Sequence, residues 1–168
     1  MNYYGVNLAV TDVQCSQKFY EALFGLEVES NLGENISFYG GLHLQEKFQW
    51  VIKQPKSKIV KESHNMALIF EEDDFDAFLE KLSHYPEIRY LNGGVRVQDW
   101  GQRVVQFYDL DGHIIEVGEN FSLLAKRMHK NGMTVSDIAV RMSIAEEEVE
   151  KLLRVPLKTA NLAQTQNF

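Results

Sequence analysis

The sequence repeats one order of secondary structure twice, about 60 residues apart, and this repeat restricts the possible fold more than any other feature. Residues 6–48 predict a strand, a helix and three further strands, and residues 66–118 predict the same order again. An aspartate stands at the start of each helix, first Asp12 and then the pair Asp73-Asp74, where a side chain can cap the first turn. The body of the chain is therefore expected to consist of two similar modules.

The predicted elements follow from the spacing of apolar residues and from glycine and proline. In the first module we expect strands at 6–10, 26–30, 36–39 and 42–48 and a helix at 14–24 that ends at Gly25. In the second we expect strands at 66–70, 87–91, 96–97, 102–108 and 113–118 and a helix at 73–83. The polar, lysine-rich residues 54–63 are expected to link the modules.

One such module cannot cover its own hydrophobic face. Two modules side by side can form one curved mixed sheet, with the helices outside and a cavity inside. The expected fold class is therefore α+β, with two strand–helix–three-strand modules and a helical tail. A concave cavity of this kind is where a small ligand would bind.

The tail, residues 122–155, predicts three helices at 122–130, 134–142 and 145–154, with a spacing that resembles a helix-turn-helix unit. The helix in the recognition position carries four carboxylates, which DNA phosphates would repel: Glu146, Glu147, Glu148 and Glu150. We therefore expect this appendage to serve packing or dimerisation, and nucleic acid is not an expected partner. Residues 156–168 are polar and are expected to be flexible.

The charge distribution supports a boundary between body and tail. The net charge of the chain is −7, of which the first 121 residues contribute −9 and the remainder +2. An acidic body is a poor match for a polyanion. Apolar runs of about 20 residues and a signal peptide are both absent, and Cys15 is the single cysteine, so we expect no membrane span and a reducing, cytoplasmic location.

Two stretches resemble the vicinal-oxygen-chelate superfamily, which includes glyoxalase I, bleomycin-resistance proteins and extradiol dioxygenases. Residues 7–28 read NLAVTDVQCSQKFYEALFGLEV and resemble its opening strand, aspartate corner and helix. Residues 106–119 read QFYDLDGHIIEVGE and resemble its closing hairpin, with Leu110 where the pattern has proline. The resemblance implies one such domain over residues 1–121, made of repeats at about 3–53 and 64–120.

The resemblance also implies where a divalent metal would bind, because the family takes its ligands from the first and last strands of each module. In the first module the first-strand position falls on Gly5, which has no side chain. Aligning the glycine turns places Gln45, in the last strand of that module, opposite Glu116. In the second module the first-strand position is Asn65 or Ala67. Glu116 alone matches the family's ligands outright.

A site with one carboxylate and two amides suits a transition metal poorly. The main hypothesis is therefore a small-molecule binder of the bleomycin-resistance kind with a degenerate metal site and no cofactor. The alternative is an enzyme of the glyoxalase (lyase) or dioxygenase kind, in which Glu116, Gln45 and an inward-turned His64 hold one Ni, Zn, Mn or Fe ion and Glu116 is the catalytic carboxylate. A third hypothesis is a ligand-sensing regulator that uses the helical tail.

Five residues are the predicted ligand-binding set: Gln45, Asn65, Trp100, Arg103 and Tyr108. We expect His43 on the outer face of the first sheet and interpret His113 as a structural residue of the last turn. Proteins of this family pair modules between two chains, so the resemblance also implies a homodimer.

Overall fold

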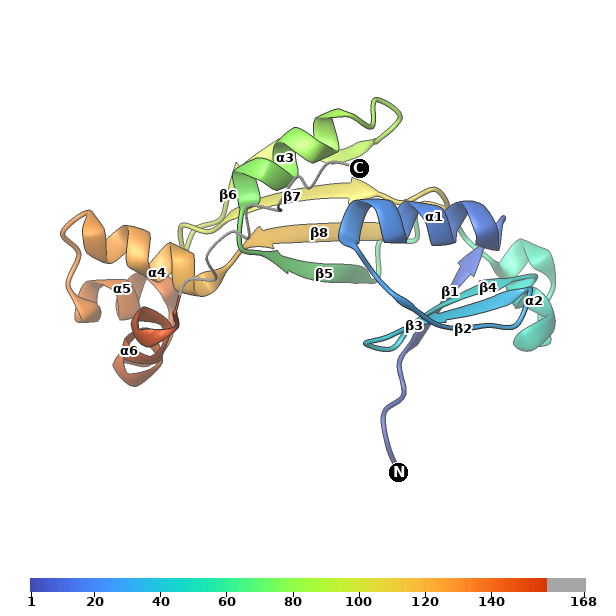
Figure 1. Cartoon of the computed structure of the whole chain (residues 1–168), viewed down its shortest axis with the longest axis horizontal. Coiled ribbons are helices and arrows are strands. Elements are labelled where there is room, and N and C mark those ends of the chain that lie inside the picture. The colour runs from blue at the N-terminus through green and yellow to red at the C-terminus, as the bar shows by residue number, and fades with distance from the viewer. Residues whose placement is uncertain (157–168) are drawn as a thin grey trace, which may run out of the picture. The chain divides into compact units, whose positions relative to one another are not determined.

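The computed structural model describes residues 1–156 and shows an α+β chain of two strand–helix–three-strand modules followed by three helices (Figure 1). The expected flexible segment beyond Pro156 lies outside the described residues. Contacts group the chain into two compact units. The first contains residues 1–68, 79–94 and 106–116, and the second contains, among the described residues, 69–78, 95–105 and 117–156.

The first module forms a four-stranded mixed sheet in the order β1-β4-β3-β2. Strand β1 is parallel to β4, whereas β3 is antiparallel to both β4 and β2. Its elements are β1 (Val6–Val10), α1 (Val13–Phe24), β2 (Val28–Asn31), β3 (Asn35–Phe38) and β4 (Leu42–Glu46). The predicted order of elements is confirmed.

The second module repeats this order in a sheet β5-β8-β7-β6. Its elements are β5 (Ala67–Glu72), α3 (Phe75–Ser83), β6 (Tyr90–Val97), β7 (Arg103–Tyr108) and β8 (Ile114–Glu119). One expectation was wrong, because the two short strands expected at 87–91 and 96–97 are the single strand β6. Gly93 and Gly94, with φ of 78° and 113°, lie inside it, and the sequence alone does not separate such a pair from a turn.

The segment between the modules is more ordered than a plain linker. It contains the short helix α2 (Phe48–Val51) and the 3-10 helix η1 (Lys56–Lys58). Strand β4 ends at Glu46 rather than at the expected residue 48, because Lys47 adopts a left-handed conformation with φ of 53°. This turn starts α2 and directs the chain away from the sheet.

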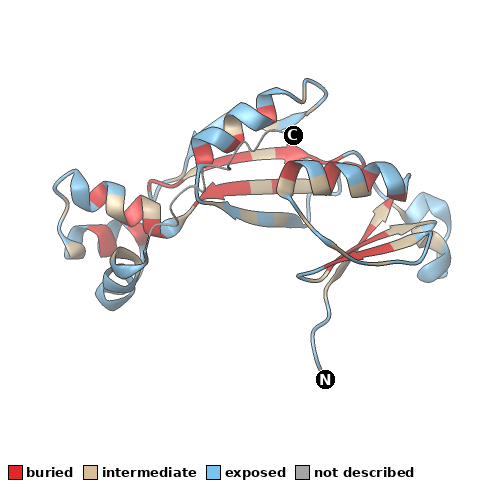
Figure 2. Cartoon of the chain, viewed as in Figure 1, coloured by how far each residue is buried: buried red, intermediate tan, exposed pale blue. Residues whose placement is uncertain are grey.

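Helix α1 covers one face of the first sheet. Asp12 caps its start by accepting the backbone N–H of Cys15 at 2.9 Å, and Gly25 ends it with φ of 65°, as the sequence predicts. Leu8 and Leu44 are buried partners in the β1–β4 ladder, and Tyr20 of α1 contacts the Phe38 ring with centroids 6.2 Å apart. Figure 2 shows this buried side in red.

Helix α1 is also joined to the turn between β7 and β8 through Asp109. The Tyr20 hydroxyl donates to Asp109 Oδ2 at 2.8 Å, and the imidazole Nδ1 of His113 lies 2.8 Å from the same oxygen. Oδ1 accepts the backbone N–H groups of Asp111 and His113 at 2.9 and 2.8 Å. A buried carboxylate is stable only when its oxygens are satisfied in this way.

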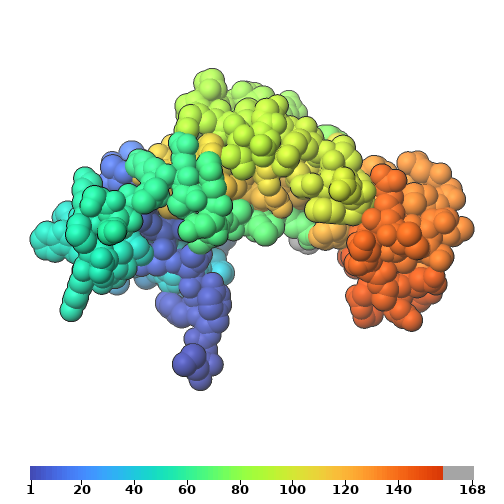
Figure 3. All heavy atoms as spheres, turned by 180° about the vertical axis from the view of Figure 1, so that it is seen from behind, coloured from blue at the N-terminus to red at the C-terminus, as the bar shows by residue number. Residues whose placement is uncertain are grey.

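The three C-terminal helices have their own core in the second unit. They are α4 (Phe121–Lys130), α5 (Val135–Met142) and α6 (Glu146–Arg154), and they form one packed group in the space-filling view (Figure 3). Thr134 caps α5 in a reciprocal capping box with Asp137. The buried side chains between the helices are Leu124, Ala125, Met128, Ile138, Ala139, Met142 and Val149.

Among residues 1–156, none of the helices combines the length and the apolar character that crossing a membrane requires.

The Asp109 cluster makes a pH-dependent contribution to stability. Burial by itself raises the pKa of Asp109, but the hydrogen bonds and charge of His113 and the Tyr20 hydroxyl outweigh it, so the pKa lies below its ordinary value. A lowered pKa in the folded state stabilises the protein above the unfolded-state pKa of about 3.9, and this stability is lost as the pH falls through the folded-state value.

We therefore expect Asp109→Asn to lower the free energy of unfolding by about 1–3 kcal/mol at pH 7. The difference from the original protein should shrink as the pH falls from 5 to 3, measured by urea unfolding at each pH. The exposed Asp99→Asn is the control and should change little. A difference that stays constant with pH would contradict this account of Asp109.

Candidate functional site

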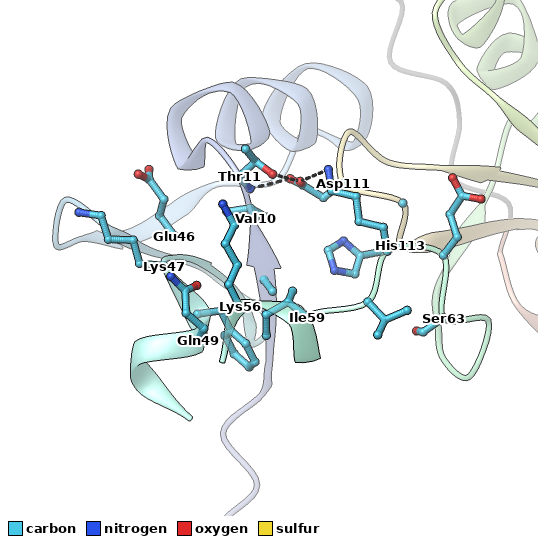
Figure 4. Close-up of a pocket in the computed structure, with 16 residues that line it drawn as sticks. Val10, Thr11, Glu46, Lys47, Gln49, Lys56, Ile59, Ser63, Asp111 and His113 are labelled. Atoms are coloured by element: carbon cyan, nitrogen blue, oxygen red, sulfur yellow. Dashed lines mark hydrogen bonds and ion pairs between the residues drawn. The ribbon is translucent and has the colours of Figure 1, made fainter. Parts of the chain in front are cut away.

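A hollow of about 330 Å³ lies at the carboxyl end of β1 in the first unit (Figure 4). A neighbouring hollow of about 360 Å³ shares six of its lining residues and extends along β1 to Asn7. We call the two together the β1 hollow. The shared residues are Ala9, Phe48, Ile59, Val60, Ser63 and His113.

One wall of the β1 hollow is the turn between β7 and β8, held by Asp111. The carboxylate of Asp111 accepts the backbone N–H of Thr11 at 3.0 Å and the Thr11 hydroxyl (Figure 4). Lys61 Nζ lies 3.1 Å from the same carboxylate. Asp111 is buried while Lys61 is exposed, so this lysine contributes mainly by neutralising a buried charge. The ion pair joins the linker to the turn between β7 and β8, whose Asp111 also bonds Thr11 at the end of β1.

His113 is oriented at the same wall. Its Nδ1 is held by Asp109, which leaves Nε2 as the ring nitrogen that can meet a ligand. The Tyr20 hydroxyl shares the same Asp109 oxygen, and burial together with the charge of Asp109 raises the pKa of Tyr20 well above its ordinary value. Tyr20 therefore stays a neutral donor that fixes the carboxylate.

Apolar side chains form another part of the lining. They come from α2, from the linker and from the approach to β5: Phe48, Ile52, Ile59, Val60 and Met66. Asn7 and Asn65 add amide groups to the same lining. The lining of the hollow thus combines apolar side chains with amide, imidazole and ammonium groups.

Gln45 lies on the open face of the first sheet, where its amide is fully engaged. Its Oε1 accepts from Asn35 Nδ2 at 3.0 Å, and its Nε2 donates to the backbone oxygens of Glu34 and Glu46 at 3.1 and 2.7 Å. These bonds cross from β4 to β3 and to its preceding turn. The amide of Gln45 therefore helps to join β4 to β3, and its hydrogen bonds are already made within the chain.

His43 shares the face of Gln45, so the expectation that it lies on the outer face was wrong. Residues two apart on a strand point to the same side. His43 is 8 % exposed and its Nδ1 lies 2.7 Å from the Ser37 hydroxyl, while the Tyr4 ring lies 4.9 Å from its own. Its buried Nε2 has no hydrogen-bond partner among the described residues.

Glu116 lies at the end of a chain of side-chain hydrogen bonds across the second sheet. Asn92 on β6 donates to Gln106 Oε1 on β7 at 3.0 Å, and Gln106 Nε2 donates to Glu116 Oε2 on β8. The carboxylate is therefore half-buried in an amide ladder. A carboxylate bonded to an amide in this way can stabilise the sheet or contact a ligand.

Two further predicted residues, His64 and Tyr108, contact each other. His64 adopts a left-handed conformation with φ of 55°, and its Nε2 lies 2.6 Å from the Tyr108 hydroxyl. The guanidinium of Arg89 lies 4.7 Å from the centre of the Tyr108 ring. Asn65, next to His64, is exposed and accepts from the Ser63 hydroxyl at 2.9 Å.

Trp100 and Arg103 belong to the second unit. Arg103 lies against α3: its guanidinium bonds Asp76 at 2.8 Å and Glu119 at 3.3 Å and stacks over the Phe75 ring. Trp100 donates its indole N–H to Gln102 Oε1 at 3.0 Å. The predicted ligand-binding set is therefore divided between the two units, with Gln45, Asn65 and Tyr108 in the first.

The residues at the family's metal positions do not fit a divalent metal ion. A Cβ on Gly5 would lie 2.0 Å from the Gly41 carbonyl oxygen, so neither histidine nor glutamate fits there without moving the β4 turn. The donors at the other positions are amides and Glu116, and no group of three His, Cys, Asp or Glu side chains with metal-binding geometry occurs among the described residues.

Sequence reasoning missed two residues of interest. His113 was interpreted as a turn residue, yet it borders both halves of the β1 hollow with a buried aspartate behind it. The spacing of Asp109, Asp111 and His113 indicates a possible cluster, but the same spacing is also typical of an ordinary turn. His43 was placed on the wrong face, and the simple alternation of β4 from Gln45 would have corrected it.

Comparisons with known proteins agree with this architecture. The family model for the glyoxalase-like domain matches residues 3–122. The crystal structure of a protein of unknown function from Agrobacterium tumefaciens has 31 % identity and a TM-score of 0.62, covering 71 % of this chain and 94 % of that one. No curated protein matches the sequence.

Two structures with named activities share the fold at lower identity. A lactoylglutathione lyase from Agrobacterium tumefaciens has 23 % identity and a TM-score of 0.54, covering 70 % of this chain and 92 % of that one. The fosfomycin resistance protein FosX from Listeria monocytogenes has 20 % identity and a TM-score of 0.53, covering 71 % and 93 %.

The resemblance inferred from residues 7–28 and 106–119 is thereby confirmed. The family model spans both modules and their linker, and the sheets have the repeated strand order. This chain belongs to the glyoxalase-like domain family of the vicinal-oxygen-chelate superfamily.

Proposed function

We propose that the protein binds a small molecule without the help of a metal ion. The observation that carries this proposal is the contact of Gly5 with Gly41, where a Cβ would lie 2.0 Å from a carbonyl oxygen. This contact removes the first-strand ligand and cannot be relieved by a side-chain rotation, since both partners are backbone. The remaining donors, Gln45 and Glu116, are held by neighbouring amides.

The β1 hollow is the proposed binding place. Its two parts, of about 330 and 360 Å³, fall within the range of small-molecule sites. The apolar part of the lining can contact the body of a ligand, while Asn65 and the Nε2 of His113 can set its orientation. The expected ligand is a small organic molecule with a few polar groups.

The metal-free character is tested by elemental analysis of the purified protein. We expect less than about 0.1 equivalent of Ni, Zn, Mn or Fe, and no change in unfolding temperature on adding EDTA or any of these ions, because a bound ligand would stabilise the folded state. Glu116→Ala should behave in the same way as the original protein.

A stoichiometric metal that disappears in Glu116→Ala would overturn the proposal. It would favour instead an enzyme of the glyoxalase or dioxygenase kind, in which Glu116 is a ligand.

The binding place is tested with two matched linker variants in a thermal-shift screen of small organic molecules. Ser63 lines both parts of the hollow, so Ser63→Trp should fill it and remove the stabilisation that a ligand gives. Ser57 lies in η1 and is not part of the lining, so Ser57→Trp should keep that stabilisation. Ligands that stabilise both variants equally would place the site elsewhere.

We also propose that the protein forms a homodimer. Apolar side chains are exposed on both edge strands of the second sheet: Ile69 on β5 is 75 % exposed and Val97 on β6 is 66 % exposed. Edge strands with exposed apolar residues are unfavourable unless another chain covers them.

Light scattering at micromolar concentration should therefore give the mass of two chains. Ile69→Lys should shift the equilibrium toward the monomer, whereas Val140→Lys, on the exposed side of α5, should not. A monomer for the unaltered chain would contradict this proposal.

The C-terminal helices are proposed to serve packing rather than nucleic-acid binding. The first turn of α6 carries Glu146, Glu147 and Glu148, and phosphates would be repelled there.

A cytoplasmic location is proposed because Cys15, a free and exposed thiol, suits a reducing compartment.

A further inference from the structure

The second unit contains an apolar groove that the proposed function does not use. It has a volume of about 360 Å³ and lies between the turn before β7 and the C-terminal helices. Its lining comes from four places in the chain: Trp100, Phe121, Met142 and Ile144, and Leu152 with Glu148 on α6. We call it the Trp100 groove.

The walls of this groove are held by specific contacts rather than by a loose loop. The indole N–H of Trp100 is bound by Gln102, whose Nε2 donates to the backbone oxygen of Glu119 at 2.8 Å. The guanidinium of Arg127 donates to the Gly101 oxygen at 3.2 Å and to Glu119 at 2.8 Å. The turn that carries Trp100 is therefore fixed against α4.

The chemistry of the groove selects one class of ligand. Five of its six lining side chains are apolar, and the two aromatic ones, Trp100 and Phe121, are exposed, at 36 % and 38 %. The single charged side chain is the carboxylate of Glu148. Aromatic faces beside one carboxylate attract a cation with an apolar body and offer nothing to an anion.

Glu148 is available to such a cation. Its Oε1 pairs with Lys151 one turn later on the same exposed helix face, with side chains 54 % and 66 % exposed. An exposed pair of this kind contributes little to stability, so a ligand cation can replace the lysine. Leu152 stands four residues after Glu148, so both project from the same side of α6.

We propose that the Trp100 groove binds a small hydrophobic amine, with its ring or alkyl body between Trp100 and Leu152 and its ammonium at Glu148. This site is separate from the β1 hollow, because all its residues belong to the second unit. The test of this proposal does not depend on whether the β1 hollow binds a ligand or whether the protein binds a metal ion.

The test uses tryptophan fluorescence in the full chain. Trp50 is 76 % exposed on α2 in the first unit, so Trp50→Phe leaves Trp100 as the single reporter with little effect on folding. The probes are 2-phenylethylammonium and 2-phenylethanol, which share a skeleton and differ in charge. We expect saturable quenching with the ammonium bound about five- to tenfold more tightly than the alcohol.

Three charge variants on α6 sharpen the result. Glu148→Gln should abolish the preference for the ammonium while leaving alcohol binding unchanged. Lys151→Ala frees the carboxylate and should strengthen ammonium binding about twofold or more. The matched control Glu147→Gln removes a neighbouring charge that does not line the groove and should keep most of the preference.

Equal affinity for the two probes, or no saturable quenching, would overturn the proposal. The chain beyond Pro156 is the main rival for the groove, because Leu152 and the end of α6 are close to it in sequence. Binding that occurs only in a chain ending at Pro156 would show that the groove is filled in the full chain, and this too would overturn the proposal.

Discussion

The rest of the first unit depends on one buried carboxylate, that of Asp109, which is 5 % exposed. It receives two side-chain groups and two backbone N–H groups, and it joins the helix of the first module to the last turn of the second. Since an unsatisfied buried charge costs several kcal/mol, these partners have to keep their places together. The same contacts orient His113 at the wall of the β1 hollow. The position of this imidazole is therefore set by hydrogen bonds that also stabilise the fold.

A second constraint is found at two positions where the family places metal ligands, Gly5 and Gln45. The close approach of Gly5 to the Gly41 carbonyl admits no side chain, and Gln45 uses its amide to join β4 to β3 and the turn before it. Both features join parts of the first sheet, and neither position offers a free side chain to a metal ion. The open face of the first sheet then offers the amide of Gln45 and the imidazole of His43, whose Nε2 has no hydrogen-bond partner among the described residues. Glu116 lies on β8 of the second sheet.

Much of the architecture followed from local signals. Alternation in the strands, the aspartate at position 12 and the glycine at position 25 act within a few residues, and the structure has the corresponding elements within about two residues. The expectation for β6 failed because Gly93 and Gly94 permit a turn as readily as an extended strand, and only pairing with β7 decides between them. The family resemblance rested on the two stretches with the strongest local patterns.

The sequence by itself thus determined the modules, the helical tail and the weakness of the metal positions, because each depends on residue type and short-range spacing. Which side chains meet was decided by the tertiary structure. Trp100 and Arg103 share a predicted ligand-binding set with Tyr108; in the structure Arg103 contacts Phe75 of α3 and Trp100 borders the C-terminal helices. His113 became a wall of the β1 hollow through Asp109, whose partner Tyr20 is 89 residues away. Contacts at that separation depend on how sheets and helices pack, and local spacing carries no information about them.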